Sequence, residues 1–257
     1  MLSTRIIPCL QLIDQSLVKT VQFGHHGYIG DPINTVRIFN ELEVDELCFL
    51  DIRATVENRV PNLKILSEIA DECFMPLSYG GGVRDALTAR KILEIGFEKI
   101  VLNTADIVNP ELVTRIADHS GNQSVIASID VKRNLWGKYH VYSHDGTRKT
   151  DMDPLEWAQR LEHLGAGELL ITSMNQDGTW DGFDIEIIKR IVHAVSIPVI
   201  ANGGAGSIEQ IGRVVNETSV SAVALGSMVV YQKKGMGVLV NFPDKDKLSE
   251  ILPTGRI

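Results

Sequence analysis

Two pairs of adjacent glycines are the residues whose chemistry is easiest to interpret in this chain of 257 residues. Gly81-Gly82 and Gly203-Gly204 each follow a short apolar run, and a second polar turn comes later, at Asn103-Thr104 and at Gly226-Ser227. Because glycine has no Cβ, backbone N–H groups at such turns can approach an anion closely. One pair alone is a weak signal, since ordinary turns also need glycine. The two pairs together predict two phosphate sites, and therefore a substrate with a phosphate at each end.

Polar residues at the ends of other apolar runs are candidates for acid–base chemistry. Asp130 closes the run 125–129. A carboxylate that is partly removed from water has a raised pKa, which suits a general acid or base. A turn or a helix cap is the alternative role for such an aspartate. Asp51 and Thr172 close two further runs, and Asp177-Gly178 follows the second of these.

The glycine pairs belong to a longer internal repeat. Residues 31–105 and 153–227 match each other at a constant offset of 122, so that Asp31-Pro32 matches Asp153-Pro154. This period is far longer than the roughly 20–50 residues of a solenoid unit. Each copy therefore contains several strand–helix units, and the chain is expected to consist of two half-structures that close on each other.

Short β-branched apolar runs alternate with longer amphipathic runs along the chain. Continuous apolar strands are typical of parallel sheets that helices cover on both faces. The alternation predicts an α/β fold, a single (β/α)₈ barrel domain. An open doubly wound sheet is the alternative. The predicted strands are 5–13, 45–50, 75–79, 99–102, 124–130, 168–172, 198–201 and 221–225, the helices are 32–43, 61–73, 85–96, 109–119, 154–165, 183–195 and 207–217, and the domain 1–257 divides into half-barrels at about 1–122 and 123–230 with a divergent segment at 231–257.

Composition excludes several classes of function. Apolar residues make up 44% and charged residues 23%, as in ordinary soluble domains. The net charge of −8 argues against nucleic-acid binding, which relies on clustered Lys and Arg. Cys9, Cys48 and Cys73 are scattered, which predicts reduced, mostly buried thiols rather than a disulfide framework or a metal site. The N-terminus lacks signal-peptide architecture, and no apolar run approaches the ~20 residues of a membrane span, so a cytoplasmic location without membrane contact is expected.

Two segments between the predicted elements are long enough to carry function. Residues 134–152 interrupt the alternation and are predicted to form a hairpin arm. Residues 21–30 contain His25-His26 and three glycines, and form either a mobile lid or a flexible connection. The histidine pair lacks a third ligand at metal spacing, so no metal is expected. The absence of a dinucleotide fingerprint likewise predicts no organic cofactor.

Four charged residues begin predicted strands at the opposite end of the barrel. They are Arg5, Glu46, Lys99 and Glu168. If their side chains turn inward, two cations and two anions ring the barrel floor, where they should pair because unpaired buried charges are costly. Taken alone, these residues favour the alternative of four solvated charges on the rim.

Several motifs together carry a family resemblance that covers nearly the whole chain to about residue 230. They resemble the cyclase subunit of imidazole glycerol phosphate synthase, a (β/α)₈ enzyme of histidine biosynthesis. The resemblance implies a glutaminase subunit docked on the barrel floor as a heterodimer, and ammonia that passes a gate of four charged residues to a bisphosphate substrate. The floor residues above fall on those gate positions, which reverses the preference for a solvated rim. The motifs are Arg5-Ile6-Ile7-Pro8-Cys9-Leu10, Phe49-Leu50-Asp51-Ile52, Gly80-Gly81-Gly82, Asn103-Thr104-Ala105, Asp130, Gly165-Ala166-Gly167-Glu168, Asp177-Gly178-Thr179 and Gly203-Gly204-Ala205-Gly206.

The chain departs from this family at three places. The family's synthase uses two catalytic aspartates; Asp130 matches the second, whereas Gln11 replaces the first. A neutral amide can orient a substrate but cannot transfer protons, and loss of an acid–base group typically costs ~10²–10⁴-fold in rate. Thr20, which follows the matching Lys19, stands where the family's loop usually has glycine, and we expect it to stiffen the lid. The tail 237–243 resembles a paralogous branch found with surface-polysaccharide genes.

Three functions are therefore considered. The first is a cyclase–lyase that uses ammonia to convert the bisphosphorylated formimino-carboxamide ribonucleotide into imidazole glycerol phosphate and aminoimidazole carboxamide ribonucleotide. The second is a paralogue that channels ammonia for acetamidino-sugar formation, with a glutaminase and a separate sugar amidotransferase. The third is a non-catalytic subunit that only docks a glutaminase and passes ammonia on. The expected catalytic residues are Asp130 and Gln11, and the expected substrate-binding residues are Lys19, Asp51, Gly81, Gly82, Asn103, Thr104, Thr172, Asp177, Gly178, Asn202, Gly203, Gly204, Gly226 and Ser227.

Overall fold

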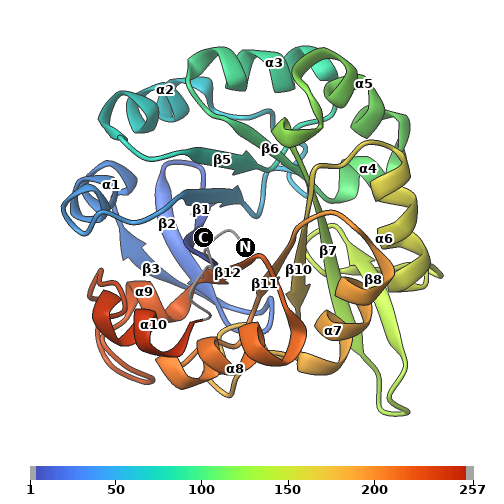
Figure 1. Cartoon of the computed structure of the whole chain (residues 1–257). Helices are drawn as coiled ribbons and strands as arrows, with labels where there is room; N and C mark the ends of the chain where they lie inside the picture. The colour runs from blue at the N-terminus through green and yellow to red at the C-terminus, as the bar shows by residue number, and fades with distance from the viewer. Residues whose placement is uncertain (1–3, 253–257) are drawn as a thin grey trace.

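A computed structural model of the protein describes residues 4–252. Eight parallel strands form a closed barrel in the order β10-β11-β12-β1-β4-β5-β6-β7, and β7 pairs back to β10 (Figure 1). This closure confirms the predicted (β/α)₈ fold and excludes the open doubly wound sheet. The barrel strands are β1 (Arg5–Ile13), β4 (Leu47–Asp51), β5 (Leu77–Gly80), β6 (Lys99–Leu102), β7 (Val125–Arg133), β10 (Glu168–Ser173), β11 (Val199–Asn202) and β12 (Ala222–Leu225).

Helices form the layer outside the strands, as Figure 1 shows. The predicted helices are present with ends shifted by a few residues. The short α4, α9 and α10 were not predicted, because the five, four and seven residues that they contain are too few to show a helical period. Within residues 4–252, none of the helices combines the length and the apolar character needed to cross a membrane. The helices are α1 (Pro32–Glu41), α2 (Leu63–Glu72), α3 (Ala86–Ile95), α4 (Thr104–Val108), α5 (Glu111–Ser120), the 3₁₀ turn η1 (Asn122–Ser124), α6 (Pro154–His163), α7 (Ile185–Ala194), α8 (Ile208–Thr218), α9 (Ser227–Val230) and α10 (Lys245–Ile251).

The repeated Asp-Pro pairs have the same local role in both copies. The Asp31 carboxylate accepts a hydrogen bond from the backbone N–H of Asn34 at the start of α1. The Asp153 carboxylate accepts from the N–H groups of Leu155 and Glu156 at the start of α6. In each case proline follows at the first helical position, where its missing N–H costs nothing. This part of the repeat therefore specifies where two helices begin.

The apolar core has two layers. The larger layer lies between the strands and the helices and includes Phe39, Phe49 and Trp157. A smaller cluster fills the barrel interior and includes Ile7, Val101 and the free, buried thiols of Cys9 and Cys48. As predicted, those two cysteines are reduced and buried. The interior cluster separates the floor of the barrel from its opposite end, the mouth, where the strands finish.

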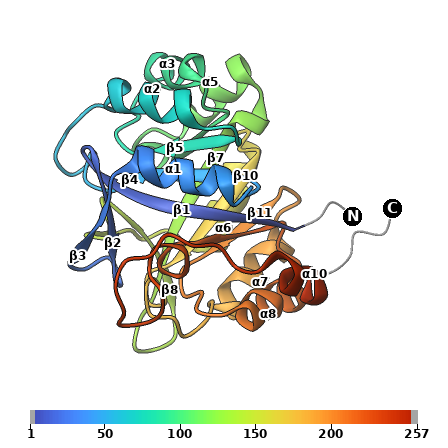
Figure 2. The same ribbon diagram turned by 90° about the vertical axis from the view of Figure 1, so that its left-hand side faces the viewer.

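Two barrel strands continue past the mouth into antiparallel hairpins (Figure 2). β1 pairs with β2 (Ser16–Thr20), which pairs with β3 (His26–Gly30). Residues 21–30 were expected to be a loop, but half of them form β3, because β2 offers an edge with which they can pair. β7 similarly pairs with β8 (Tyr139–Ser143) and β8 with β9 (Arg148–Lys149), which confirms the predicted hairpin arm. Residues 1–3 and 253–257, at the ends of the predicted 1–257 domain, lie outside the described residues.

Candidate active site

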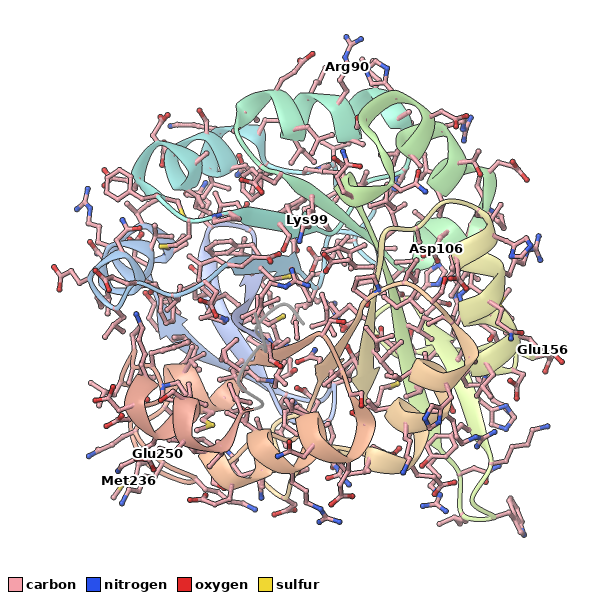
Figure 3. All side chains as sticks on the ribbon, in the orientation of Figure 1. Arg90, Lys99, Asp106, Glu156, Met236 and Glu250 are labelled. Atoms are coloured by element: carbon pink, nitrogen blue, oxygen red, sulfur yellow. The ribbon has the colours of Figure 1, made fainter. Side chains whose placement is uncertain are left out.

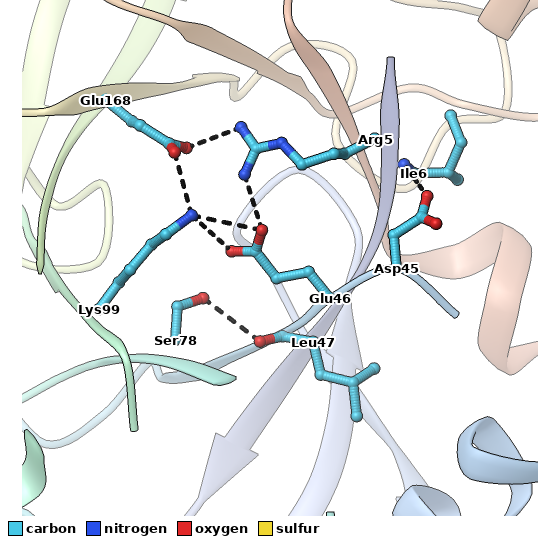
Figure 4. A network of polar contacts seen from close by, with 8 residues as sticks. All are labelled: Arg5, Ile6, Asp45, Glu46, Leu47, Ser78, Lys99 and Glu168. Atoms are coloured by element: carbon cyan, nitrogen blue, oxygen red, sulfur yellow. Dashed lines mark hydrogen bonds and ion pairs between the residues drawn. The ribbon is translucent and has the colours of Figure 1, made fainter. Parts of the chain in front are cut away.

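The four charges at the floor form a closed ring of ion pairs (Figure 4). Nη1 of Arg5 lies 2.7 Å from Oε2 of Glu46, and Nη2 lies 3.0 Å from Oε2 of Glu168. Nζ of Lys99 lies 3.2 Å from Oε1 of Glu46 and 3.0 Å from Oε1 of Glu168. Each residue therefore contacts two partners of opposite charge.

These side chains lie inside the barrel rather than on its rim. Figure 3 shows Lys99 within the ring of helices, whereas Arg90 and Glu156 extend away from the molecule. The side chain of Glu46 is only 4% exposed. Burial alone lowers the pKa of Arg5, but its hydrogen bonds and charge interactions with Glu168 and Glu46 raise it overall. The ring thus closes the floor with charges that neutralise one another.

The predicted substrate-side residues gather at the mouth around two cavities that share lining residues. The larger cavity, of about 120 Å³, is lined among others by Gln11, Lys19, Asp51, Gly81, Gly82, Asn103, Thr104, Asp130, Thr172, Asp177, Asn202 and Gly226. The smaller, of about 10 Å³, is lined by Asp177, Gly178, Asn202, Gly203, Gly204, Ala205, Ala224, Gly226 and Ser227. The first glycine pair therefore faces the larger cavity, and the second pair faces the smaller one.

Backbone geometry explains why each of these turns needs glycine. Gly81 has φ +119°, and a Cβ there would lie 2.8 Å from Cβ of Asp51. Gly203 has φ +91°, and a Cβ there would lie 2.8 Å from the carbonyl oxygen of Ser173. Residues other than glycine rarely adopt this left-handed region, and here they would also clash. Both turns therefore bring backbone close to a neighbouring strand end.

Asp130, on β7, is the carboxylate at the mouth with no cationic neighbour. Nδ2 of Asn103 donates to Oδ2 of Asp130 at 3.2 Å and to the carbonyl oxygen of Ser128 at 3.0 Å. Burial raises the pKa of Asp130 to about 7, and the negative charges of Asp145 and Asp177 add to this rise. Hydrogen bonds from Thr172 and Asn103 lower the pKa by less than these causes raise it. In the described part of the chain Asp130 forms no ion pair. Both protonation states are therefore accessible near neutral pH.

Lys19 and Asp177 form a buried pair that joins β2 to the loop after β10. Nζ of Lys19 lies 2.9 Å from Oδ1 of Asp177 and donates to the carbonyl oxygen of Thr20 at 2.6 Å. The Thr20 hydroxyl donates to Oδ2 of Asp177 at 3.2 Å. The backbone N–H of Gln22 also donates to the carbonyl oxygen of Asp177 at 2.8 Å. The start of the predicted lid is therefore tied to the barrel.

Gln11, on β1, is fixed in one orientation by its neighbour. Its Oε1 accepts from the backbone N–H of Thr20 at 2.8 Å and lies 3.2 Å from the Thr20 hydroxyl. A backbone N–H can only donate, so the amide atom that faces it must be oxygen. The Nε2 group then carries the only hydrogens that Gln11 can offer to a ligand. Gln11 is a donor in this cavity, where a carboxylate would be an acceptor and a base.

Asp51 lines the larger cavity, but protein groups already occupy its oxygens. Arg59 binds it in bidentate fashion, with Nη1–Oδ2 2.8 Å and Nη2–Oδ1 3.1 Å. The backbone N–H groups of Arg53 and Ala54 donate to Oδ1 at 3.1 and 3.0 Å. Asp51 therefore orders the loop after β4. Arg59 was missed from sequence because it lies eight residues away along an irregular loop.

Phe23 and Asp145 are among the residues of the larger cavity that sequence reasoning also missed. Asp145 precedes a glycine in the hairpin arm, and an Asp-Gly pair is a turn signal that indicates a carboxylate at the tip. His25-His26 belongs to no cluster of three metal-ligating side chains, and residues 4–252 contain no such cluster.

Comparisons with known proteins agree with this architecture. A family model described as histidine biosynthesis protein matches residues 5–235. A Pseudomonas aeruginosa protein provisionally named imidazole glycerol phosphate synthase subunit hisF2 is 49% identical over 248 residues, which are 96% of this chain and 99% of that protein. A Leptospira borgpetersenii protein provisionally named subunit HisF is 43% identical over 98% of this chain and 100% of its own length. Alkaliphilus metalliredigens imidazole glycerol phosphate synthase subunit HisF is 41% identical over 91% of this chain and 92% of its own length. The chain therefore belongs to the histidine biosynthesis protein family, as a HisF-like cyclase subunit.

Proposed function

We propose that this protein is the ammonia-using cyclase subunit of an imidazole glycerol phosphate synthase. Its substrate would be the bisphosphorylated formimino-carboxamide ribonucleotide, which it would split into imidazole glycerol phosphate and aminoimidazole carboxamide ribonucleotide. The observation that carries the proposal is Asp130, a carboxylate with a pKa of about 7 in the larger cavity. Gly81-Gly82 line this cavity, and it shares lining residues with the smaller cavity at Gly203-Gly204. Such a group can take and return a proton at neutral pH.

The other residues at the mouth would bind and orient the substrate. The turns Gly81-Gly82 and Gly203-Gly204, with Asn103-Thr104 and Gly226-Ser227, would hold the two phosphates through backbone N–H groups. Gln11 would donate from Nε2 to an oxygen of the substrate. Asn103 would fix the Asp130 carboxylate while leaving it free to exchange its proton.

The floor would admit ammonia from a glutaminase partner, as the word subunit in the relatives' names supports. A small cavity of about 10 Å³ lies in the barrel interior, lined by Glu46, Cys48 and Ser78 among others. Glu46 therefore belongs to the ion-pair ring and also lines this interior cavity. Ammonia entry would require Lys99 or Arg5 to leave its glutamates for a moment, because their ion pairs close the ring.

The experiment that tests this function supplies free ammonia in place of the glutaminase. Purified protein is mixed with an ammonium salt and the bisphosphorylated nucleotide, and both products are measured by chromatography. The proposal predicts stoichiometric formation of the two products. Tight binding of the nucleotide by calorimetry without any product would reject it.

Gln11 favours a second candidate, the paralogue that channels ammonia for acetamidino-sugar formation. Because an amide does not take up or release a proton near neutral pH, Gln11 cannot replace the family's first catalytic aspartate as a proton carrier. Thr20 holds its amide oxygen, so that only the amide N–H groups are left for a ligand. Under this alternative the natural protein shows no cyclase turnover, and Gln11→Asp creates it or raises it by ~10²-fold or more. Full turnover by the natural protein would exclude the alternative.

A further inference from the structure

The turn between β8 and β9 places a further carboxylate at the mouth. Asp145 lines the larger cavity together with Asp130. His144 and Asp145 have φ of +53° and +57°. Aspartate tolerates this left-handed conformation better than most residues. The turn therefore directs a carboxylate into the cavity at the mouth.

Three contacts hold this turn in place. The backbone N–H of His144 donates to the Thr104 hydroxyl at 2.8 Å. Gly146 packs so closely that a Cβ there would lie 2.8 Å from Cδ2 of Phe23 and would also clash with Met174. Nη1 of Arg53 lies 3.5 Å from Oδ2 of Asp145, and its side chain is tied in turn to Glu57 at 3.2 Å. Asp145 is thus positioned by groups from three other parts of the mouth.

The charges around Asp145 leave its proton exchangeable. Burial raises the pKa of Asp145 to about 6, while the charges of Arg53 and His26 lower it. Asp145 in turn helps to raise the pKa of Asp130. Arg53 acts on Asp145 from the loop after β4, and His26 acts on it from β3. The charge of Asp145 therefore influences the titration of Asp130, and both carboxyl groups face the same cavity.

We propose that Asp145 is the second acid–base group of this site, in the role that Gln11 cannot fill. This inference rests on the proposed ammonia-dependent function. When ammonia adds to a carbonyl carbon, the resulting carbinolamine must lose water to form the C=N bond. Asp130, which has the higher pKa and no cationic neighbour, would act as the carboxylic acid and give its proton to the hydroxyl oxygen, which leaves as water. Asp145, as the carboxylate beside Arg53, would take a proton from the nitrogen, so that charge and atoms balance.

The test compares Asp145→Asn with Asp14→Asn. Asp14 also has a left-handed backbone, φ +55°, but lies in the exposed β1–β2 turn outside the cavity. Asparagine keeps this conformation, so both variants should fold. We expect Asp145→Asn to lower ammonia-dependent turnover by ~10²–10⁴-fold and to abolish the rise in rate on the acid side of the optimum, with nucleotide binding unchanged. Asp14→Asn should match the natural protein, and Asp145→Glu should recover part of the rate.

A second measurement separates failure of this inference from failure of the proposed function. Nucleotide binding is followed by calorimetry between pH 5 and 8 in two buffers of different ionisation enthalpy, which reports protons taken up or released. If the natural protein shows no turnover, the proposed function fails, but loss of proton exchange in Asp145→Asn would still support a carboxyl group that faces the ligand. Proton exchange and turnover that are both unchanged in Asp145→Asn would overturn the inference.

Discussion

The floor and the mouth of this barrel use the same kinds of residue in opposite ways. At the floor, each of Arg5, Glu46, Lys99 and Glu168 contacts two residues of opposite charge, with distances of 2.7–3.2 Å. At the mouth, Asp130 has amide and hydroxyl neighbours but no cation, and its pKa is about 7. A buried carboxylate with cationic partners stays ionised and holds neighbouring strands together, whereas a buried carboxylate without them has a raised pKa and can act as an acid or a base. The difference predicts that floor substitutions change stability and that mouth substitutions change rate.

The largest expected effect is on catalysis at the mouth. Asp130→Asn keeps the shape of the side chain but removes its proton exchange, so we expect ammonia-dependent turnover to fall by ~10²–10⁴-fold with the nucleotide dissociation constant unchanged. Steady-state kinetics with ammonium salt measure this loss. Asp118→Asn, on the exposed face of α5, is the matched control and should leave the rate unchanged. A similar rate for both variants would remove Asp130 from the chemistry.

The next effect is on stability at the floor. Glu46→Gln leaves Arg5 and Lys99 with one carboxylate partner each, and breaking a buried pair costs about 3 kcal/mol in free energy of unfolding. Urea denaturation of the variant and of the natural protein measures this loss in the free energy of unfolding. Glu72→Gln, which breaks the exposed pair with Arg37, is the control and should cost less than about 1 kcal/mol. Equal losses for the two variants would mean that the floor ring is effectively solvated.

An effect of opposite sign is expected for stability at the mouth. The folded protein holds the proton of Asp130 up to about pH 7, whereas the unfolded chain releases it near pH 3.8. The folded state therefore binds more protons in that window, and its stability falls as pH rises from about 4 to 7. Asp130→Asn removes this penalty, so the variant should be more stable than the natural protein by up to ~4 kcal/mol at pH 8 and nearly equal at pH 4. Thermal or urea unfolding at the two pH values tests this, and a destabilised variant at pH 8 would contradict it.

The smallest predicted effect concerns the contact that fixes Gln11. Thr20→Val keeps the side-chain shape but removes the hydroxyl that lies near Gln11 and donates to Asp177. Because the backbone N–H of Thr20 still holds Oε1 of Gln11, we expect a loss of only ~1 kcal/mol in stability and little change in turnover. A large loss of turnover would show that the hydroxyl, rather than the backbone, orients Gln11.

Much of the fold was predictable because it depends on local patterns. Continuous apolar runs placed the barrel strands, and the repeated Asp-Pro pairs marked the starts of α1 and α6. The pairing of β3 with β2 was not predicted, because His26–Gly30 has little apolar alternation and forms a strand only beside its partner. The sequence pattern alone also did not determine that the four floor side chains point into the barrel, because an Arg or Glu at the start of a strand can face either way.

The site was predictable only where a residue stands at a strand end. Asp130, Asn103 and Thr172 met at the mouth because parallel strands finish on the same edge. Arg59 and Asp145 reach the mouth through loop and hairpin geometry, which sequence spacing does not specify. The binding of Asp51 by Arg59 and the rise in the pKa of Asp130 caused by Asp145 could therefore be found only from the structure.

The central claim, that ammonia-driven chemistry takes place at Asp130, is tested most directly by the pH dependence of turnover. Product formation from the nucleotide is measured between pH 5 and 9 at a fixed concentration of unprotonated ammonia, for the natural protein and for Asp130→Asn. We predict a fall in kcat/KM on the alkaline side that the natural protein shows and the variant lacks, with a lower rate for the variant throughout. Identical profiles and rates for the two proteins would contradict the account.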